Sequence, residues 1–277
     1  MKIIYVLSCI TATLIMTSCA TASLTKYKAV GRVKKYEFHS YDIPAEFDGF
    51  KIVFASDFHY ESKFTHKRLL NSIKLFNSLH PDVLLLGGDY PGINPGSMDT
   101  LFSELSKIKS EYGIYAVMGN HDTGKYYKPI IDAMHKYGIS IMQDNGYSLI
   151  KDSSRIIITG VKDSFDKSIS AISPSQLFPK EDFVIMVTHS PDYVEDKDVS
   201  NANLVLAGHT HGGQISMFKK ISPISHSKYG SRFLTGFKQN SKGTPIIITN
   251  GIGTSRKNIR LFTPSEIVLI TLRRETK

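Results

Sequence analysis

The chain has 277 residues, of which 41% are hydrophobic and 21% charged, and it carries a formal net charge of +9 with a pI near 9.3. This composition excludes a disordered or collagen-like chain and predicts a globular protein with a substantial core, in one large or two small domains. The positive charge favours anionic partners such as phosphate esters, nucleic acid or acidic membrane, although a solvated lysine-rich surface is the simpler explanation.

Residues 1–18 have the pattern of a bacterial lipoprotein signal peptide. Lys2 precedes an uncharged apolar run that ends at Met16, which is shorter than the roughly 20 residues of a membrane-spanning helix. The run leads into Ile-Met-Thr-Ser-Cys at 15–19, which resembles a lipobox. We therefore expect cleavage before Cys19, a lipid on that cysteine, and an exported, membrane-anchored lipoprotein. An uncleaved N-terminal membrane anchor is the alternative.

The remaining chain divides into a leader and a main domain. Residues 19–48 are predicted to form a polar, basic tether and a first strand over Lys35–His39, and residues 49–277 the main domain. Apolar runs at 50–55, 82–86 and 113–118 predict buried strands, and the spacing of apolar residues predicts helices over 67–79 and 98–108. This alternation indicates βαβ units around a mainly parallel sheet.

Each of these three strands runs directly into polar residues. About 30 residues, the length of one βαβ unit, separate Asp57 from Asp89 and Asp89 from Asn120. We therefore expect these groups to lie beyond the carboxyl ends of their strands, on the edge where open α/β sheets place their ligands. The polar residues at this edge are Asp57, His59, Asp89, Asn120, His121 and Asp122.

The second half of the chain is richer in strand signals. A hairpin is predicted over 147–159, and further strands over 183–187, 204–207, 245–249 and 266–271. The strand at 183–187 runs into His189, and the strand at 204–207 into Gly208-His209-Thr210-His211. These endings suggest a second sheet that faces the same site.

Collected in chain order, the strand-end groups read D-x-H, G-D, G-N-H-D, H and G-H-x-H. This series resembles the calcineurin-like metallophosphoesterase family, and the wording Gly-His-Thr-His-Gly-Gly-Gln at 208–214 is similar to its exported or membrane-associated bacterial branch. The resemblance implies an α/β fold in which two mixed β-sheets pack between helices as a four-layer αββα sandwich.

The resemblance also implies a site for two divalent metal ions. Asp57, His59 and His211 would bind the first, Asn120, His189 and His209 the second, and Asp89 would bridge them. Imidazole, carboxylate and amide ligands without a thiolate suit Mn, Fe, Zn, Co or Ni, among which the sequence does not choose. His121 would protonate the leaving oxygen. Asp122 is expected either to orient His121 or to cap the helix that follows.

Several other residues are weaker candidates. Arg232, Arg256 and Arg260 could contact an outer phosphate, although ion pairs or solvated side chains are the simpler explanation. Gly251-Ile252-Gly253 lacks the last glycine of a nucleotide-binding loop and is predicted to be a turn beside the site. The histidines outside the motif blocks, among them His226, are expected to have packing or surface roles.

The resemblance predicts a metal-dependent hydrolase that cleaves a phosphodiester or pyrophosphate bond with a water activated by two metals. The substrate is left undefined, with a lipid-linked phosphoester as one option and no nucleic acid expected, and the oligomeric state is also undefined. Three alternatives stay open: a UDP-2,3-diacylglucosamine pyrophosphatase of lipid A synthesis on an inward-facing membrane anchor, a nuclease, and a non-catalytic ligand-binding lipoprotein.

Overall fold

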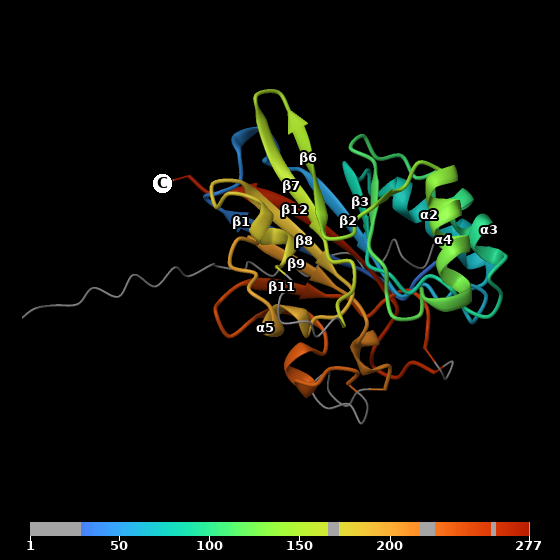
Figure 1. The fold of residues 1–277 in the computed structure, drawn as a ribbon. Coiled ribbons are helices and arrows are strands. Elements are labelled where there is room, and N and C mark those ends of the chain that lie inside the picture. The colour runs from blue at the N-terminus through green and yellow to red at the C-terminus, as the bar shows by residue number, and fades with distance from the viewer. Residues whose placement is uncertain (1–28, 166–171, 216–224, 256–258, 277) are drawn as a thin grey trace, which may run out of the picture.

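The computed structural model describes residues 29–165, 172–215, 225–255 and 259–276. In this part of the chain, two six-stranded mixed sheets pack face to face (Figure 1). The expected signal peptide and Cys19 lie outside the described residues, as does Arg256. None of the helices within these ranges has the length and hydropathy of a membrane span.

The first sheet contains β1 (Arg32–Ser40), β2 (Lys51–Ala55), β3 (Val83–Leu86), β4 (Ile114–Ala116), β5 (Ser140–Ile141) and β12 (Glu266–Arg274). Its order is β1-β12-β2-β3-β4-β5. The strands from β2 to β5 run parallel, whereas β12 is antiparallel to β2 and parallel to β1. All four residues of β3 are buried, as expected for a central strand covered on both faces.

The second sheet contains β6 (Asn145–Lys151), β7 (Ser154–Gly160), β8 (Phe183–Thr188), β9 (Leu204–Ala207), β10 (Gly236–Gln239) and β11 (Pro245–Ile248). Its order is β10-β11-β9-β8-β7-β6. The predicted hairpin is confirmed as the antiparallel pair β6 and β7, and β7, β8, β9 and β11 run parallel.

The helices are α2 (His66–Ser78), α3 (Ser97–Leu105), α4 (Tyr127–Lys136) and the short α5 (Tyr193–Asp196). Figure 1 shows α2, α3 and α4 grouped on one side of the molecule, and their apolar residues share one core with β2, β3 and β4. A second core fills the space between the two sheets, and a third places α5 against β9 and β11. The four-layer αββα arrangement is therefore confirmed. Short 3-10 helices lie at Ala45–Phe47, Gly124–Tyr126, Pro174–Leu177, His211–Gly213 and Gly230–Phe233.

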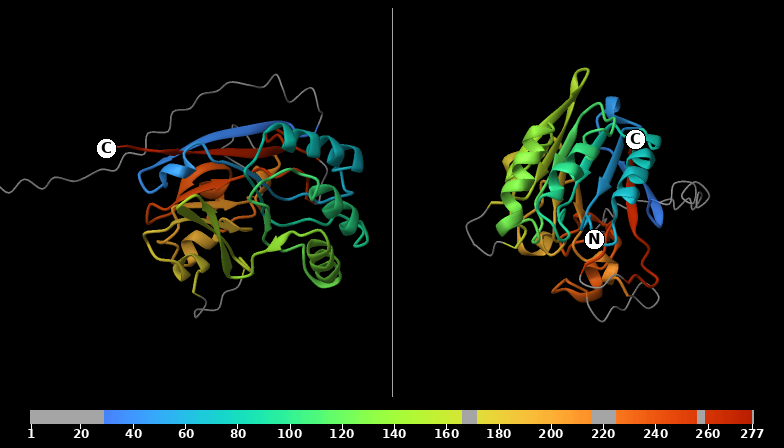
Figure 2. Two further views of the ribbon diagram at one scale, coloured as in Figure 1. Left: turned by 90° about the horizontal axis from the view of Figure 1, so that it is seen from above. Right: turned by 90° about the vertical axis from the view of Figure 1, so that its right-hand side faces the viewer.

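One strand from the second half of the chain does not join the second sheet. β12, at the end of the chain, belongs to the first sheet, where it lies between β1 and β2. β1, which we grouped with the tether, is thereby an edge strand of the main domain, and its Tyr36 and Phe38 are buried in the core between the sheets. Figure 2 shows the two strands side by side along one edge of the molecule.

Candidate metal centre

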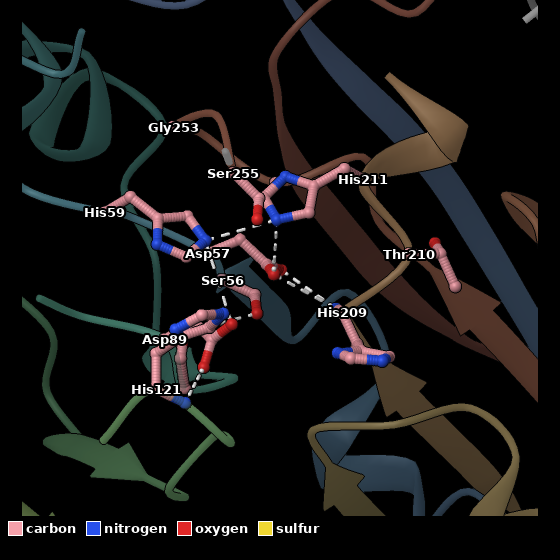
Figure 3. Close-up of polar contacts among 12 residues, drawn as sticks. Ser56, Asp57, His59, Asp89, His121, His209, Thr210, His211, Gly253 and Ser255 are labelled. Carbon is pink, nitrogen blue, oxygen red and sulfur yellow. Dashed lines mark hydrogen bonds and ion pairs between the residues drawn. The ribbon is translucent and has the colours of Figure 1, made fainter. Parts of the chain in front are cut away.

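The strand-end residues converge on one edge that both sheets share. Asp57 and His59 follow β2, Asp89 follows β3 and Asn120 follows β4, whereas His189 follows β8 and the pair His209 and His211 follows β9. In the close-up of Figure 3, the labelled members of this set point toward a common centre. The structure thus brings together all seven predicted metal ligands, which sequence separations of up to 154 residues keep apart in the chain.

Three side chains form a first cluster, Asp57, His59 and His211, whose ligand atoms all lie within 4.8 Å of one another. His211 Nε2 lies 3.2 Å from His59 Nε2 and 3.2 Å from Asp57 Oδ1. Atoms that bind one ion at about 2.1 Å lie roughly 3.0–3.4 Å apart, so these separations fit a shared cation. All three residues are buried, so the cluster is shielded from bulk water.

A second cluster forms around His189. Its Nε2 lies 3.2 Å from Asn120 Oδ1, 3.2 Å from His209 Nδ1 and 3.3 Å from Asp89 Oδ2. One nitrogen therefore has two oxygens and a second nitrogen at the spacing of ligands on one ion. This donor set contains imidazole, amide and carboxylate and no thiolate, which suits a divalent transition metal.

Asp89 lies between the two clusters. Its Oδ2 is 3.3 Å from His189 Nε2 in the second cluster and 3.7 Å from His59 Nε2 in the first. Its other oxygen accepts a hydrogen bond of 2.9 Å from the backbone N–H of His121, which fixes the plane of the carboxylate. A carboxylate in this position can neutralise two neighbouring cations.

Backbone carbonyl groups orient two of the imidazoles. His189 Nδ1 donates to the carbonyl oxygen of Gly87 at 2.7 Å, so Nε2 is the nitrogen that faces the site and offers its lone pair once it has lost its proton. His209 also forms a hydrogen bond with the backbone of His226. These bonds select the ring nitrogens that face the cluster, as is usual for histidine ligands of metals.

The charges of the site perturb its ionisable groups strongly. Burial lowers the pKa of both His59 and His211, and burial together with the charge of His189 lowers the pKa of His209 to about 3. For His189, burial acts in the same direction, but Asp89 and Asp57 outweigh it and raise the pKa to about 10. Three of the four imidazoles are thereby held in the neutral form that binds metals.

The backbone is strained at the same residues. Asp57, His59, Asp89, His209 and His211 all have φ between 42° and 69°, a region that residues other than glycine rarely occupy. Each such residue costs on the order of 1–3 kcal/mol, and strain of this kind concentrates at functional sites. Five of the seven predicted ligands have this conformation, which indicates that the local backbone positions the ligands at a cost in folding stability.

Arg260 fastens the loop after β11 to a ligand. Its guanidinium donates to the carbonyl oxygens of His211 at 3.2 Å, Asn250 at 2.7 Å and Gly253 at 3.1 Å. Burial lowers the pKa of Arg260 to about 10. The predicted turn at 251–253 lies against Asp57, and Gly253 N donates a hydrogen bond of 2.7 Å to the Asp57 carbonyl oxygen. Arg260 therefore has a structural role at the site, which the sequence did not reveal.

The hydrogen-bond partners of Asp122 are neither the ring of His121 nor the start of the following helix, the two that we expected. Its carboxylate accepts hydrogen bonds from the backbone N–H groups of Asp89 at 2.8 Å, Tyr90 at 2.9 Å and Gly119 at 2.6 Å. The side chain is fully buried, and burial, with the charge of Asp89, raises its pKa to about 8 against the effect of these donors. Asp122 holds the loops that carry Asp89 and Asn120, and the helical segments that follow it have no side-chain cap.

His121 lies at the exposed rim of the site. Its ring stands edge-on to that of His59, with 5.2 Å between the ring centroids. Neither cluster needs it as a ligand. The ring is thus accessible to a bound molecule while its backbone N–H is held by Asp89.

Two aromatic rings stand beside His209, and Arg232 makes the ion pair that was the simpler of its two expected roles. The ring of Phe165 lies 5.0 Å from that of His209, and the ring of His226, which we expected to have a packing or surface role, lies 5.9 Å from it. Arg232 forms an ion pair of 2.5 Å with Glu195 and not a contact within the ligand clusters. Neither aromatic residue stands in a motif block, so only the fold reveals its position.

Comparisons with known proteins identify the family of the chain. A family model described as calcineurin-like phosphoesterase matches residues 50–213. The metallophosphoesterase YkuE of Bacillus subtilis is 31% identical over 242 residues, which cover 83% of this chain and 82% of that protein. A metallophosphoesterase of Campylobacter jejuni is 28% identical over 239 residues, which cover 84% of this chain but 61% of the relative. Among solved structures, the Thermus thermophilus protein TT1561 matches 73% of this chain and 90% of its own, with 12% identity and a TM-score of 0.47.

Proposed function

Because the chain belongs to the calcineurin-like phosphoesterase family, we propose that it is a dinuclear metal hydrolase acting on a phosphodiester or pyrophosphate bond. The observation that carries the proposal is the pair of ligand clusters with Asp89 between them. Asp57, His59 and His211 would hold one ion, Asn120, His189 and His209 the other, and Asp89 both. Such ions supply Lewis acidity to phosphoryl oxygens and lower the pKa of water.

We assign the proton-donor role to His121. Its ring is exposed beside His59, so it can reach the leaving oxygen of a phosphoester bound at the clusters. Asp122 acts at a distance from the substrate, because its carboxylate accepts from backbone N–H groups of the loops that carry Asp89 and Asn120. Asp122 is therefore a positioning residue in this proposal.

The experiment is turnover of bis-p-nitrophenyl phosphate by purified protein supplied with Mn²⁺, compared with Asp89→Asn and His121→Ala variants. We expect Asp89→Asn to lose bound metal and activity together. His121→Ala should keep its metal and lose roughly 10²–10⁴-fold in kcat, as expected for a missing general acid. Activity that survives Asp89→Asn would contradict the two-metal assignment.

The proposal extends to location. Export with a lipid on Cys19 would place the domain at a membrane surface, next to phosphoesters that are linked to lipids. Labelling with a radioactive fatty acid, with Cys19→Ser as the control, tests this step by itself. Label retained in the Cys19→Ser protein would contradict a lipid on that residue.

A further inference from the structure

Three large apolar side chains are exposed on the loop that precedes β12. Phe262 is 64% exposed, Ile259 54% and Leu261 50%. We call these three residues the apolar loop surface. Phe262 also has a φ of 59°, a conformation that is unfavourable for a bulky residue. The backbone thus presents an aromatic ring to solvent at a local cost, which argues against an accidental exposure.

The apolar loop surface is fastened to the metal centre. Arg260, between two of its members, donates to the carbonyl oxygen of His211. The neighbouring Leu261 N–H donates at 2.8 Å to the carbonyl oxygen of Gln214, three residues after His211. The apolar residues therefore lie at the same end of the molecule as the ligands, where Figure 2 shows the loops of the C-terminal third gathered (orange and red in its right-hand view).

The described chain begins at this same end. Arg68 donates to the carbonyl oxygens of Ala29 at 3.2 Å and Ile252 at 3.4 Å, and Ile252 belongs to the turn that Arg260 holds. Gly31 N donates at 3.0 Å to Ser265 Oγ, shortly after Phe262 in the chain. A segment of about ten residues, as from Cys19 to Ala29, spans at most about 35 Å. A lipid on Cys19 would keep this end of the domain near the bilayer.

We propose that the apolar loop surface inserts into the interfacial region of an anionic lipid bilayer and seats the metal centre against the headgroups. Apolar side chains buried at the headgroup boundary and a net positive charge, here +9 for the full chain and +8 once Lys2 is removed with the signal peptide, together favour binding to anionic membranes. The insertion itself does not depend on the proposed hydrolysis. Its consequence for the substrate does, since a phosphoester in a lipid headgroup would then meet the site without leaving the membrane.

The chain contains no tryptophan, so a single introduced indole reports on one place. The experiment compares Phe262→Trp with Ile150→Trp in the full chain, on vesicles of brominated phosphatidylglycerol and phosphatidylcholine. Ile150 is 66% exposed on the β6–β7 hairpin and serves as the matched control at another surface. We expect the indole at 262 to shift to the blue and to be quenched at least about twofold more than the indole at 150. Equal quenching at both positions would overturn the proposal.

Other occupants of the surface give different results. A blue-shifted indole at 262 without vesicles overturns the proposal in favour of a second copy if the shift grows with protein concentration, and in favour of another part of the same chain if it does not. A Leu261→Ser and Phe262→Ser double variant should keep turnover of the soluble substrate bis-p-nitrophenyl phosphate while its binding to vesicles falls relative to an Ile150→Ser control. If the unsubstituted protein does not hydrolyse bis-p-nitrophenyl phosphate, this result contradicts the proposed function but not the proposed membrane insertion.

Discussion

The backbone N–H of His209 donates to the carboxylate of Asp57, at 3.0 Å from Oδ2 and 3.2 Å from Oδ1. Asp57 belongs to the first cluster and His209 to the second. The two ligand sets are thus joined by a backbone hydrogen bond as well as by Asp89, and the turn after β9 has to pass close to the turn after β2.

Gly208 permits that close approach. A Cβ atom at this position would overlap Ser56 Oγ and Asp57 Oδ2. We predict that Gly208→Ala displaces Asp57 and lowers the metal content of the purified protein severalfold, nearly as much as loss of a histidine ligand. The measurement is metal content by mass spectrometry together with the melting temperature. Gly96→Ala is the control, because its nearest neighbour would be a side-chain atom at 3.4 Å. Full metal content in Gly208→Ala would contradict this interpretation.

Arg260 should matter for the first cluster in particular. Its removal leaves several buried carbonyl groups without their donor, so Arg260→Ala is predicted to lower the free energy of unfolding by about 2–4 kcal/mol. Loss of the support behind His211 should weaken metal binding by roughly 10–100-fold. Arg260→Lys should restore little, because an ammonium cannot reproduce the planar fork of donors.

The control for Arg260 is Arg155→Lys. Arg155 makes an exposed ion pair with Asp182, so this change should cost well under about 1 kcal/mol. Chemical denaturation measures the stabilities, and competition with a chelator measures metal affinity. If Arg260→Ala binds metal with normal affinity at both ligand clusters, the loop that Arg260 holds does not support the site.

The ligands could be predicted from the sequence because each directly follows an apolar strand. Parallel strands of similar spacing place their carboxyl ends together, so Asp57, Asp89 and Asn120 had to meet once the βαβ units were identified. The hairpin of β6 and β7 could be predicted equally well, since its two strands are neighbours in the chain.

The remaining features depend on pairings between distant segments. β12 meets β1 across 234 residues, and no local pattern specifies which sheet a closing strand joins. The role of Asp122 was hidden for a related reason. Its partners are backbone N–H groups, two of them more than 30 residues away, and backbone groups carry no sequence signal. Arg260 likewise binds carbonyl groups in a loop without periodicity.

Asp122→Asn tests whether that residue acts through Asp89 or through His121. An amide has one acceptor oxygen and turns its NH₂ group toward backbone donors, so we expect a loss of about 2 kcal/mol in stability and lower metal content. The same fall in metal content should appear when the change is made in a His121→Ala protein. If the substitution has no further effect in that background, Asp122 acts by orienting His121.

Metal uptake should release protons and depend on pH. In the metal-free protein, burial lowers the pKa of His189, but Asp89 and Asp57 overcome this effect and raise it to about 10, so the ring carries a proton near neutral pH. This raised pKa stabilises the metal-free fold fully below pH 6.5 and progressively less as the pH rises toward 10. A metal ion at Nε2 has to displace that proton, so affinity should rise by about tenfold per pH unit between pH 7 and 9. Calorimetry in two buffers of different ionisation enthalpy measures the protons released, with His189→Gln as the control. A pH-independent affinity with no proton release would show that His189 is already neutral, with its only ring proton on the nitrogen that faces Gly87.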